Sequence, residues 1–301
     1  DAPDVIIEKR RRPIGGDFPP MVRGSQPTDG GQLSFSPAEL ELFSNSPQAV
    51  KDCIKKYAGA SEYINGIDRF CLWIEDEALE TVKEDPEVAR RLKKIVEFRL
   101  QSKASSTVEY AIFPHRFRQR AYKPTDSIIV PRVSSERREY TPIGYLGPDT
   151  VISDAAFAIY DAEPWLFALL TSSMHMAWLR AVGGKMKTDF RYSNTLVYST
   201  FPVPDLSDID KETLTEAALR VLDVREYHCD STLAELYDPD KMPRNLKEAH
   251  GVVDGLVDKL YSKHGFEDDE ARLSTLFAIY EEAIAAEKEA EASKPKRTRR
   301  K

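Results

Sequence analysis

Residues 180–204 read RAVGGKMKTDFRYSNTLVYSTFPVP, and the character of the chain changes within this stretch. Gly183 and Gly184 close a long apolar segment with helical periodicity. Beyond them, charged or polar side chains alternate with apolar or small ones, which is the two-residue period of a strand. The pattern predicts an extended ribbon with four charged side chains on one face: Lys185, Lys187, Asp189 and Arg191.

The charged side chains of this ribbon are of the types that read a base pair. Lysine can donate hydrogen bonds to O6 and N7 of guanine, and aspartate can accept one from N4 of cytosine. Two residues on one face of a strand lie about 7 Å apart, within reach of both bases of a pair. The ribbon therefore indicates sequence-specific DNA recognition. The alternative is an ordinary Lys–Asp ion pair on a solvated strand edge.

The composition is that of a protein with ordinary hydrophobic cores. At 301 residues, of which 41% are hydrophobic, the chain is long enough for two or three domains. No apolar run approaches the ~18 residues of a membrane helix. Cys53, Cys71 and Cys229 fit buried thiols in a reducing cytoplasm better than a disulfide frame or a zinc cluster, and five scattered histidines add no metal-ligand spacing.

The net charge of −7 is distributed unevenly along the chain. Residues 86–204 hold 17 Lys and Arg against 11 Asp and Glu, whereas residues 205–293 hold 10 against 23. The last eight residues, KPKRTRRK, add six positive charges and no acid. A basic middle is where a phosphate backbone would bind, and the acidic part after it would repel DNA.

Periodicity and capping residues predict a mixed α/β region followed by helices alone, which is an α+β fold class. Helices are expected over 37–43, 48–59, 86–102, 163–182, 211–227, 245–263 and 268–292. Short strands are expected over 5–8, 32–35, 69–74, 113–122, 126–134, 139–146 and 150–160. The helix over 163–182, His175 included, is expected in the core, and Leu219 is among the buried positions of the C-terminal helices.

Four parts of the chain follow from these patterns. Residues 1–59 are expected to be a linker or the edge of a preceding domain, and residues 60–204 an α+β domain whose basic segments contact DNA. A helical C-terminal domain is expected over 205–293, and a basic tail over 294–301 that is disordered until an anionic partner orders it.

Two further basic segments are candidates for phosphate contacts. Hydroxyl and guanidinium groups bind phosphate oxygens, and they cluster between two predicted strands at Ser134, Ser135, Arg137 and Arg138. Arg132, just before them, could serve either this loop or a base edge. An exposed polar loop with a Glu–Arg pair is the alternative reading.

The second segment is FPHRFRQR, in which a strand would place Arg116, Arg118 and Arg120 on one face and Phe117 on the other. A helix face, or salt bridges to the acidic C-terminal part, would explain these arginines equally well.

Four stretches carry a resemblance to a known family: 19–31 (PPMVRGSQPTDGG), 61–74 (SEYINGIDRFCLWI), 128–146 (IIVPRVSSERREYTPIGYL) and 172–202. Together they resemble the type IIL, MmeI-like restriction–modification proteins. Those proteins join a nuclease, a helical connector, an adenine-N6 methyltransferase, a target recognition domain and a helical C-terminal domain. The resemblance implies that Lys187 and Asp189 occupy the two positions that set the identity of one base pair, here G·C.

The catalytic parts of that family are not visible in this sequence. Its Asn-Pro-Pro-aromatic motif has only a near match in Asn45-Ser46-Pro47-Gln48, which reads as a helix cap, and no nuclease signature occurs. The chain begins at Asp1 rather than Met and has no signal-peptide pattern, so we expect a fragment of a longer polypeptide. The resemblance implies that this fragment lies downstream of both catalytic domains, with residues 1–59 as a linker or the edge of the methyltransferase domain and residues 60–204 as the target recognition domain. No catalytic, cofactor or metal residue is therefore assigned, and S-adenosylmethionine, with Mg²⁺ for a fused nuclease, belongs to the parent polypeptide.

The expected partners are double-stranded DNA and the methyltransferase domain of the same polypeptide, with no membrane. The alternative function is a protein–protein scaffold that holds partner subunits through its acidic helices and has no DNA readout of its own. DNA binding that weakens steeply with salt distinguishes recognition from scaffolding.

Overall fold

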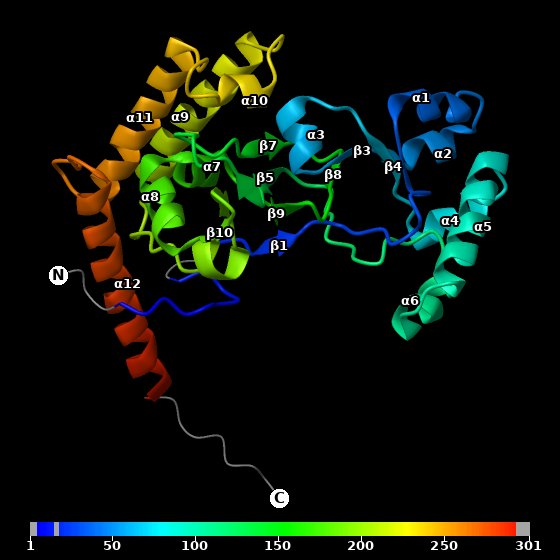
Figure 1. The fold of residues 1–301 in the computed structure, drawn as a ribbon, viewed down its shortest axis with the longest axis horizontal. Helices are drawn as coiled ribbons and strands as arrows, with labels where there is room; N and C mark the ends of the chain where they lie inside the picture. Colours follow the sequence, from blue (N-terminus) through cyan, green and yellow to red (C-terminus); the bar gives the residue numbers. More distant parts are fainter. Residues whose placement is uncertain (1–4, 15–17, 293–301) are drawn as a thin grey trace, which may run out of the picture.

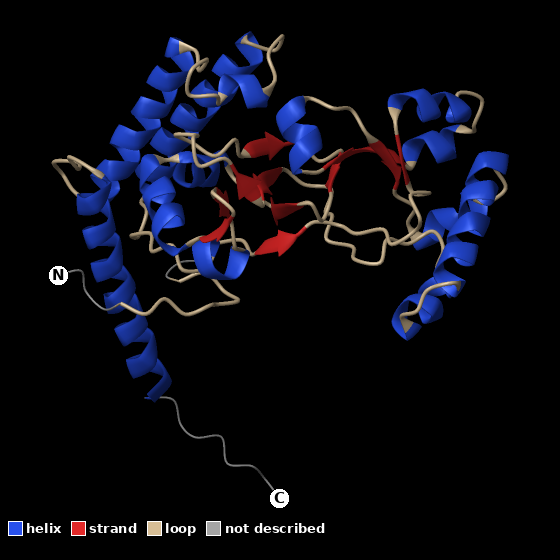
Figure 2. Cartoon of the chain, in the orientation of Figure 1, coloured by secondary structure: helices blue, strands red, loops and turns tan. Residues whose placement is uncertain are grey.

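The computed structural model describes residues 5–14 and 18–292. Figure 1 shows three small sheets in the middle of the molecule, with helices gathered at both ends. The α+β class is confirmed, since strands occur only before residue 192 and helices alone follow (Figure 2). The tail 294–301 lies outside the described residues. No helix in the described part is long and apolar enough to cross a membrane.

The central sheet is antiparallel, with its strands in the order β1-β9-β5-β7. Its strands are β1 (Met21–Arg23), β9 (Ala156–Tyr160), β5 (Ser127–Pro131) and β7 (Gly144–Leu146). Every residue of β5 and β9 is buried, because both faces of these strands are covered. Ile128 and Ile159 face the main helical core, whereas Ile129 and Ala158 face a smaller cluster that includes Tyr63 of α3 (Ala60–Asn65).

The second sheet has the order β2-β4-β3-β8, with β3 and β8 parallel. Its strands are β2 (Ser34–Phe35), β4 (Phe70–Leu72), β3 (Ile54–Ala58) and β8 (Thr150–Ile152). Its core is closed by α1 (Pro37–Leu40), η1 (Glu41–Phe43), α2 (Gln48–Asp52), α4 (Asp76–Val82) and α5 (Pro86–Leu100). The predicted helix over 86–102 is thus confirmed as α5, which is followed by α6 (Ser105–Glu109) and η2 (Tyr110–Ile112).

The two sheets are joined tightly. Only residues 153–155 separate β8 of one sheet from β9 of the other. Beside this link, the Ser25 amide donates to the Ile152 carbonyl at 2.7 Å. A Cβ on Gly24 would lie 2.2 Å from the carbonyl oxygen of Ser153, so the chain passes from β1 toward the second sheet through a position that only glycine can occupy.

The predicted helix over 48–59 is wrong in its second half. The helix α2 ends at Asp52, and Ile54–Ala58 forms β3 between β4 and β8. A central strand gains main-chain hydrogen bonds on both edges, which outweighs the weak helix preference of IKKYA. Strands from residues 1–59 pair with strands from later residues, and a domain boundary near residue 59 stays a prediction.

The predicted single helix over 163–182 is two helices, α7 (Pro164–Thr171) and α8 (Ser173–Val182). Ser172 adopts an extended conformation between them, and its hydroxyl accepts a hydrogen bond from the amide of His175. Serine is a favoured N-cap because this bond satisfies one free amide of the first turn. The polar triplet at 171–173 was the signal of this break, and the long apolar segments on both sides of it favoured the prediction of one helix.

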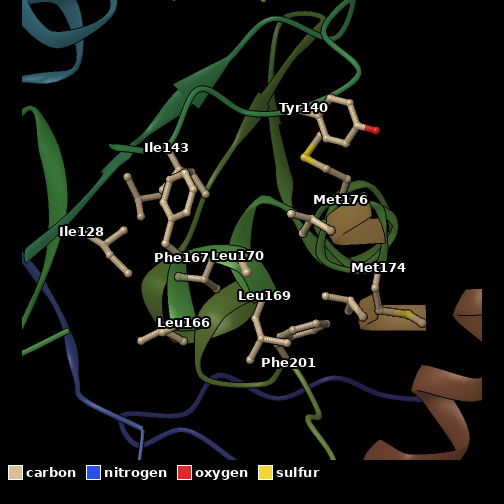
Figure 3. Packing of buried hydrophobic residues seen from close by; sticks show 14 of the residues in the cluster. Ile128, Tyr140, Ile143, Leu166, Phe167, Leu169, Leu170, Met174, Met176 and Phe201 are labelled. Carbon is tan, nitrogen blue, oxygen red and sulfur yellow. The ribbon is translucent and has the colours of Figure 1, made fainter. Parts of the chain in front are cut away.

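The C-terminal helices cover the central sheet from one side. They are α9 (Asp208–Tyr227), α10 (Leu233–Leu236), α11 (Arg244–Tyr261) and α12 (Asp269–Ala292). Figure 3 shows Phe167 of α7 beside Ile128 and Ile143 of the sheet region, and Met176 of α8 beside Tyr140. Leu219 is 45% exposed, so its predicted burial is wrong. One continuous core therefore joins the sheet to the C-terminal helices.

Candidate nucleic-acid interface

A short hairpin follows α8 directly. It consists of β10 (Gly184–Met186) and β11 (Asp189–Arg191), which pair with Met186 opposite Asp189. The reversal at residues 187–188 requires a positive φ of 58° at Lys187. β11 also pairs with β6 (Val133–Ser134), and this makes a small three-stranded sheet.

The predicted single ribbon with four charges on one face is therefore wrong. Residues opposite each other in an antiparallel pair share a face, so Asp189 and Arg191 lie on one face of the hairpin. Lys185 lies on the other face, with its Nζ 5.9 Å from the centre of the Phe190 ring. Lys187 occupies the tip. The two-residue period holds only within one strand, and the turn resets it.

The cations of the hairpin have no acidic partner in the described part of the chain. Lys185, Lys187 and Arg191 are exposed, and none of them forms an ion pair with residues 5–14 or 18–292. Asp189 is half-buried, and it interacts electrostatically with Arg138. Unneutralised cations at the tip of a two-stranded ribbon are available to an anionic ligand.

The loop after β6 lies next to the hairpin, as the pairing of β6 with β11 requires. Arg137 is exposed and pairs with Asp240 at 2.6 Å, and Ser135 Oγ accepts a hydrogen bond from the Arg137 amide. Partial burial lowers the pKa of Arg138. Ser134 is 4% exposed and its hydroxyl is buried, so the predicted phosphate contact of Ser134 has no accessible atom in this structure.

Arg132 supports the small sheet. Its carbonyl accepts a hydrogen bond from the amide of Tyr192 at 2.9 Å. Its guanidinium donates to the carbonyl of Asp154 at 3.2 Å and lies 5.7 Å from the centre of the Phe157 ring. Arg132 thus links the small sheet to the loop between β8 and β9.

The segment 113–122 is not a strand, so the prediction of a strand with Arg116, Arg118 and Arg120 on one face is wrong. Residues 113–118 form turns and bends, and only Gln119 pairs, in an isolated bridge with Gln26. Arg116 binds Asp76 through two hydrogen bonds, one of 2.7 Å from Nε, and Arg120 binds Glu75. These acids cap the start of α4, and the Arg116 bonds hold the pKa of Asp76 well below its usual range.

Arg118 has no ion pair among the described residues, and its guanidinium lies 4.9 Å from the centre of the Tyr110 ring. The fully buried Arg99 holds the segment 113–118 in place through its side-chain hydrogen bonds. Its guanidinium donates to the carbonyls of Thr28, Pro27, Tyr110, Phe113 and Arg116. Figure 1 places α4 to α6 at the opposite end of the molecule from α8 and β10. The structure therefore unites the hairpin with the 132–138 loop and separates both from Arg116–Arg120.

The C-terminal helices hold α8, which carries the hairpin. The carboxylate of Asp254 accepts hydrogen bonds from the Ser173 amide at 2.6 Å and from the Tyr140 hydroxyl at 2.6 Å. Burial raises the pKa of Asp254 despite these bonds. At the other end of α8, Arg180 pairs with Asp269 of α12 at 2.9 Å. Both ends of α8 are thus tied to the acidic helices.

His175 lies in the core as predicted, at 1% exposure. Its Nε2 lies 2.9 Å from the hydroxyl of Tyr192, the residue that follows β11. Burial lowers the pKa of His175 to about 3, so the ring is neutral at pH 7. The contact joins α8 to the end of the hairpin.

Sequence analysis missed a third basic segment, the run Lys9–Arg12. Residues 5–8, predicted as a strand, form none, and the chain instead runs beside α12 (Figure 1). The Arg10 amide donates to the Thr195 carbonyl at 2.8 Å, which places the run beside η3 (Asn194–Tyr198), the short π-helix that follows the hairpin. The run of four cations is visible in the sequence, but its position beside η3 and the hairpin is not.

The metal-ligating residue types are scattered in the described part of the chain. Among residues 5–14 and 18–292, no group of three or more His, Cys, Asp or Glu is arranged to hold a metal ion. Cys53 and Cys71 are buried as expected, whereas Cys229 is exposed. The near match Asn45–Gln48 is the turn that leads into α2.

The geometry defines an α+β domain that presents a basic hairpin, fused to a helical domain that positions it. Two family models cover this division: "MmeI, target recognition domain" matches residues 1–205, and "MmeI, C-terminal domain" matches residues 206–286. The chain belongs to the MmeI family of type IIL restriction–modification proteins.

Two known proteins illustrate the relationship. DNA methyltransferase A of Bacillus subtilis (strain 168) is 41% identical over 282 residues, which cover 94% of this chain and 32% of that protein. The solved structure of the type IIL restriction–modification enzyme MmeI in complex with DNA superposes with a TM-score of 0.87 at 36% identity, covering 95% of this chain and 38% of that one. The chain thus spans about a third of the length of these relatives.

Proposed function

We propose that this chain is the DNA target recognition module of a bacterial adenine-N6 DNA methyltransferase or restriction–modification enzyme. The observation that carries the proposal is the β10–β11 hairpin, whose three cations have no acidic partner among the described residues. The hairpin directly follows α8, and contacts with the C-terminal helices hold both ends of α8. A similar chain of known structure, MmeI, is in complex with DNA.

The hairpin reads bases from the major groove. That groove is about 12 Å wide and admits a two-stranded ribbon tip first. Lys187 at the tip and Asp189 beside it, on β11, bind the guanine and the cytosine of one pair. Arg191 and Lys185 extend the readout on the two faces of the hairpin.

Phosphate contacts fix the register of the hairpin on the duplex. Ser135 and Arg138 lie in the loop that the small sheet places beside the hairpin, whereas Arg137 of the same loop would first have to release Asp240 to bind a phosphate. Arg118 is the remaining phosphate candidate of its segment, because Arg116 and Arg120 are occupied by acidic partners. Such contacts provide affinity without sequence information.

The chemistry belongs to a methyltransferase domain of the same polypeptide. That domain binds S-adenosylmethionine and acts on an adenine flipped out of the duplex that this module has recognised. A fused nuclease would require Mg²⁺. The parent acts on the DNA of a bacterial cytoplasm.

A double exchange of charge tests the assignment of the readout pair. In the parent polypeptide, Lys187→Glu together with Asp189→Arg should change the preferred base pair at one position of the methylated site, with about 1–3 kcal/mol of discrimination. Sequencing of methylated adenines in the host genome measures the site before and after the exchange. An unchanged recognition sequence at every base, with methylation retained, would overturn the assignment.

A further inference from the structure

We infer that Arg11 and Arg12 form a second phosphate-binding site beside the readout hairpin, which grips the duplex backbone next to the bases that are read. The inference rests on the proposed function and adds to it a contact from the far N-terminal end of the sequence. Arg11 and Lys185, the first lysine of the hairpin, are 174 residues apart in the sequence. Only the fold brings their two segments together.

The main chain fixes the position of this segment. The Arg10 amide donates to the Thr195 carbonyl at 2.8 Å, and the Ile14 amide donates to the Ser199 carbonyl at 2.9 Å. Arg11 and Arg12 lie between these two anchors, which are both on or next to η3. Only Tyr192 and Ser193 separate η3 from the end of the hairpin. The two arginines are therefore held beside the hairpin.

The side chains of the run divide into anchors and free cations. Arg10 is 21% exposed and makes two hydrogen bonds, of 2.6 and 2.7 Å, to the carboxylate of Glu287 on α12. Arg11 and Arg12 are exposed, and neither forms an ion pair within the described residues. Arg10 therefore anchors the segment to α12, whereas Arg11 and Arg12 are free to bind a ligand.

Nearby acids exclude Lys9 from the same assignment. Lys9 lines a groove between this segment and α12 together with Glu8, Glu281 and Glu287, whose charges would repel a phosphate. Arg11 and Arg12 do not line this groove and continue toward the anchor at Ile14. The site therefore begins after Arg10.

The chemistry of two adjacent guanidinium groups fits phosphodiester oxygens. Arginine presents a planar fork of donors that binds phosphate in bidentate fashion and stays charged at every physiological pH. No hydrogen-bond acceptor is offered, so the site would not distinguish cytosine or adenine by their amino groups. The ligand is therefore the backbone of double-stranded DNA, and the contact adds affinity without changing sequence preference.

The test measures salt dependence with the 301-residue chain and a mixed-sequence DNA duplex. Each phosphate contact contributes about 0.9 to the slope of log K against log salt, so Arg11→Ala with Arg12→Ala should lower the slope by about 1.8. The affinity should fall about 10-fold to 100-fold at ~0.1 M salt. Arg11→Lys with Arg12→Lys should retain most of the slope, since the charges remain.

A matched control removes the same charge elsewhere. Lys51 in α2 and Arg220 in α9 are exposed and free of ion pairs in the described structure, and Figure 1 places α2 at the opposite end of the molecule from β10. Lys51→Ala with Arg220→Ala should leave the slope unchanged. An equal loss in both double variants, or an unchanged slope in the Arg11/Arg12 variant, overturns the inference. A wild-type chain with no salt-dependent DNA binding overturns the proposed function instead.

Discussion

Two basic segments of this protein look alike in sequence and differ in structure. FPHRFRQR at 113–120 and KMKTDFR at 185–191 both alternate cations with other side chains. In the first, Arg116 and Arg120 are neutralised by Asp76 and Glu75. In the second, Lys185, Lys187 and Arg191 have no acidic partner among the described residues. One segment is part of the framework, and the other is available to a ligand.

The difference shows that the pattern of charge alone does not determine whether a cation can bind DNA. The acids that occupy Arg116 and Arg120 come from 40 and 45 residues earlier in the chain, at the start of α4. The hairpin pairs only with β6 among the described strands, and no ion pair joins its cations to an acid of the described residues. Availability is a property of the tertiary neighbours, and the following variants test it.

The largest expected effect is on the framework side. Arg99→Met removes a fully buried guanidinium that donates to five carbonyls, and it leaves the carbonyls of Thr28 and Arg116 without a donor among the described residues. We expect unfolding in urea to show a loss of about 3 kcal/mol or more. Arg118→Ala is the matched control, because Arg118 is only partly buried and its guanidinium makes no ion pair among the described residues, and it should cost less than about 1 kcal/mol. A small effect of Arg99→Met would mean that the carbonyls are satisfied by water.

A second effect concerns the core contact behind the hairpin. His175 has its pKa lowered to about 3 in the fold, and the unfolded chain protonates it below about pH 6.5. Its contribution to stability is thus complete above that pH and is lost as the pH falls toward 3. Between about pH 6.5 and 4.5 the wild type should lose about 2 kcal/mol more unfolding free energy than His175→Gln. Parallel pH curves for the two proteins would contradict this.

The direct comparison pairs two double variants of equal charge. Lys185→Ala with Arg191→Ala should weaken binding to a DNA duplex about tenfold or more at ~0.1 M salt. Arg116→Ala with Arg120→Ala should weaken it less than about threefold, because those charges are already neutralised by acids. Fluorescence anisotropy over a salt series measures both. Equal losses would show that Asp76 and Glu75 release their arginines to DNA.

The smallest effect is expected at the tip of the hairpin. Lys187 adopts a φ of 58°, which costs a non-glycine residue about 1 kcal/mol. Lys187→Gly should therefore raise the unfolding free energy by up to about 1 kcal/mol while it relaxes the preference at one base pair. Thr188→Gly, at a residue without positive φ, should lower stability instead. A stable Lys187→Gly variant with unchanged specificity would place the readout elsewhere.

The sequence predicted elements best where one signal was sufficient. Pro86 after Asp85 begins α5, and its apolar stripe defines the helix to Leu100. Prediction from sequence failed where pairing with distant strands determined the secondary structure, as at Ile54–Ala58. It also failed at Lys187, where a turn without glycine interrupts a strand pattern. The site residues of the hairpin could be named from residue type, but their faces could not, because register depends on where the turn falls.

The link between the two larger sheets has a mechanical consequence. Three residues join β8 to β9, and Gly24 packs against the main chain of Ser153 with no room for a side chain. Such a joint has no slack for a hinge, so we expect both ends of the molecule to move as one rigid body. The distance between the DNA-contacting residues at the two ends is then fixed. A duplex whose groove spacing does not match this distance has to bend in order to contact both ends.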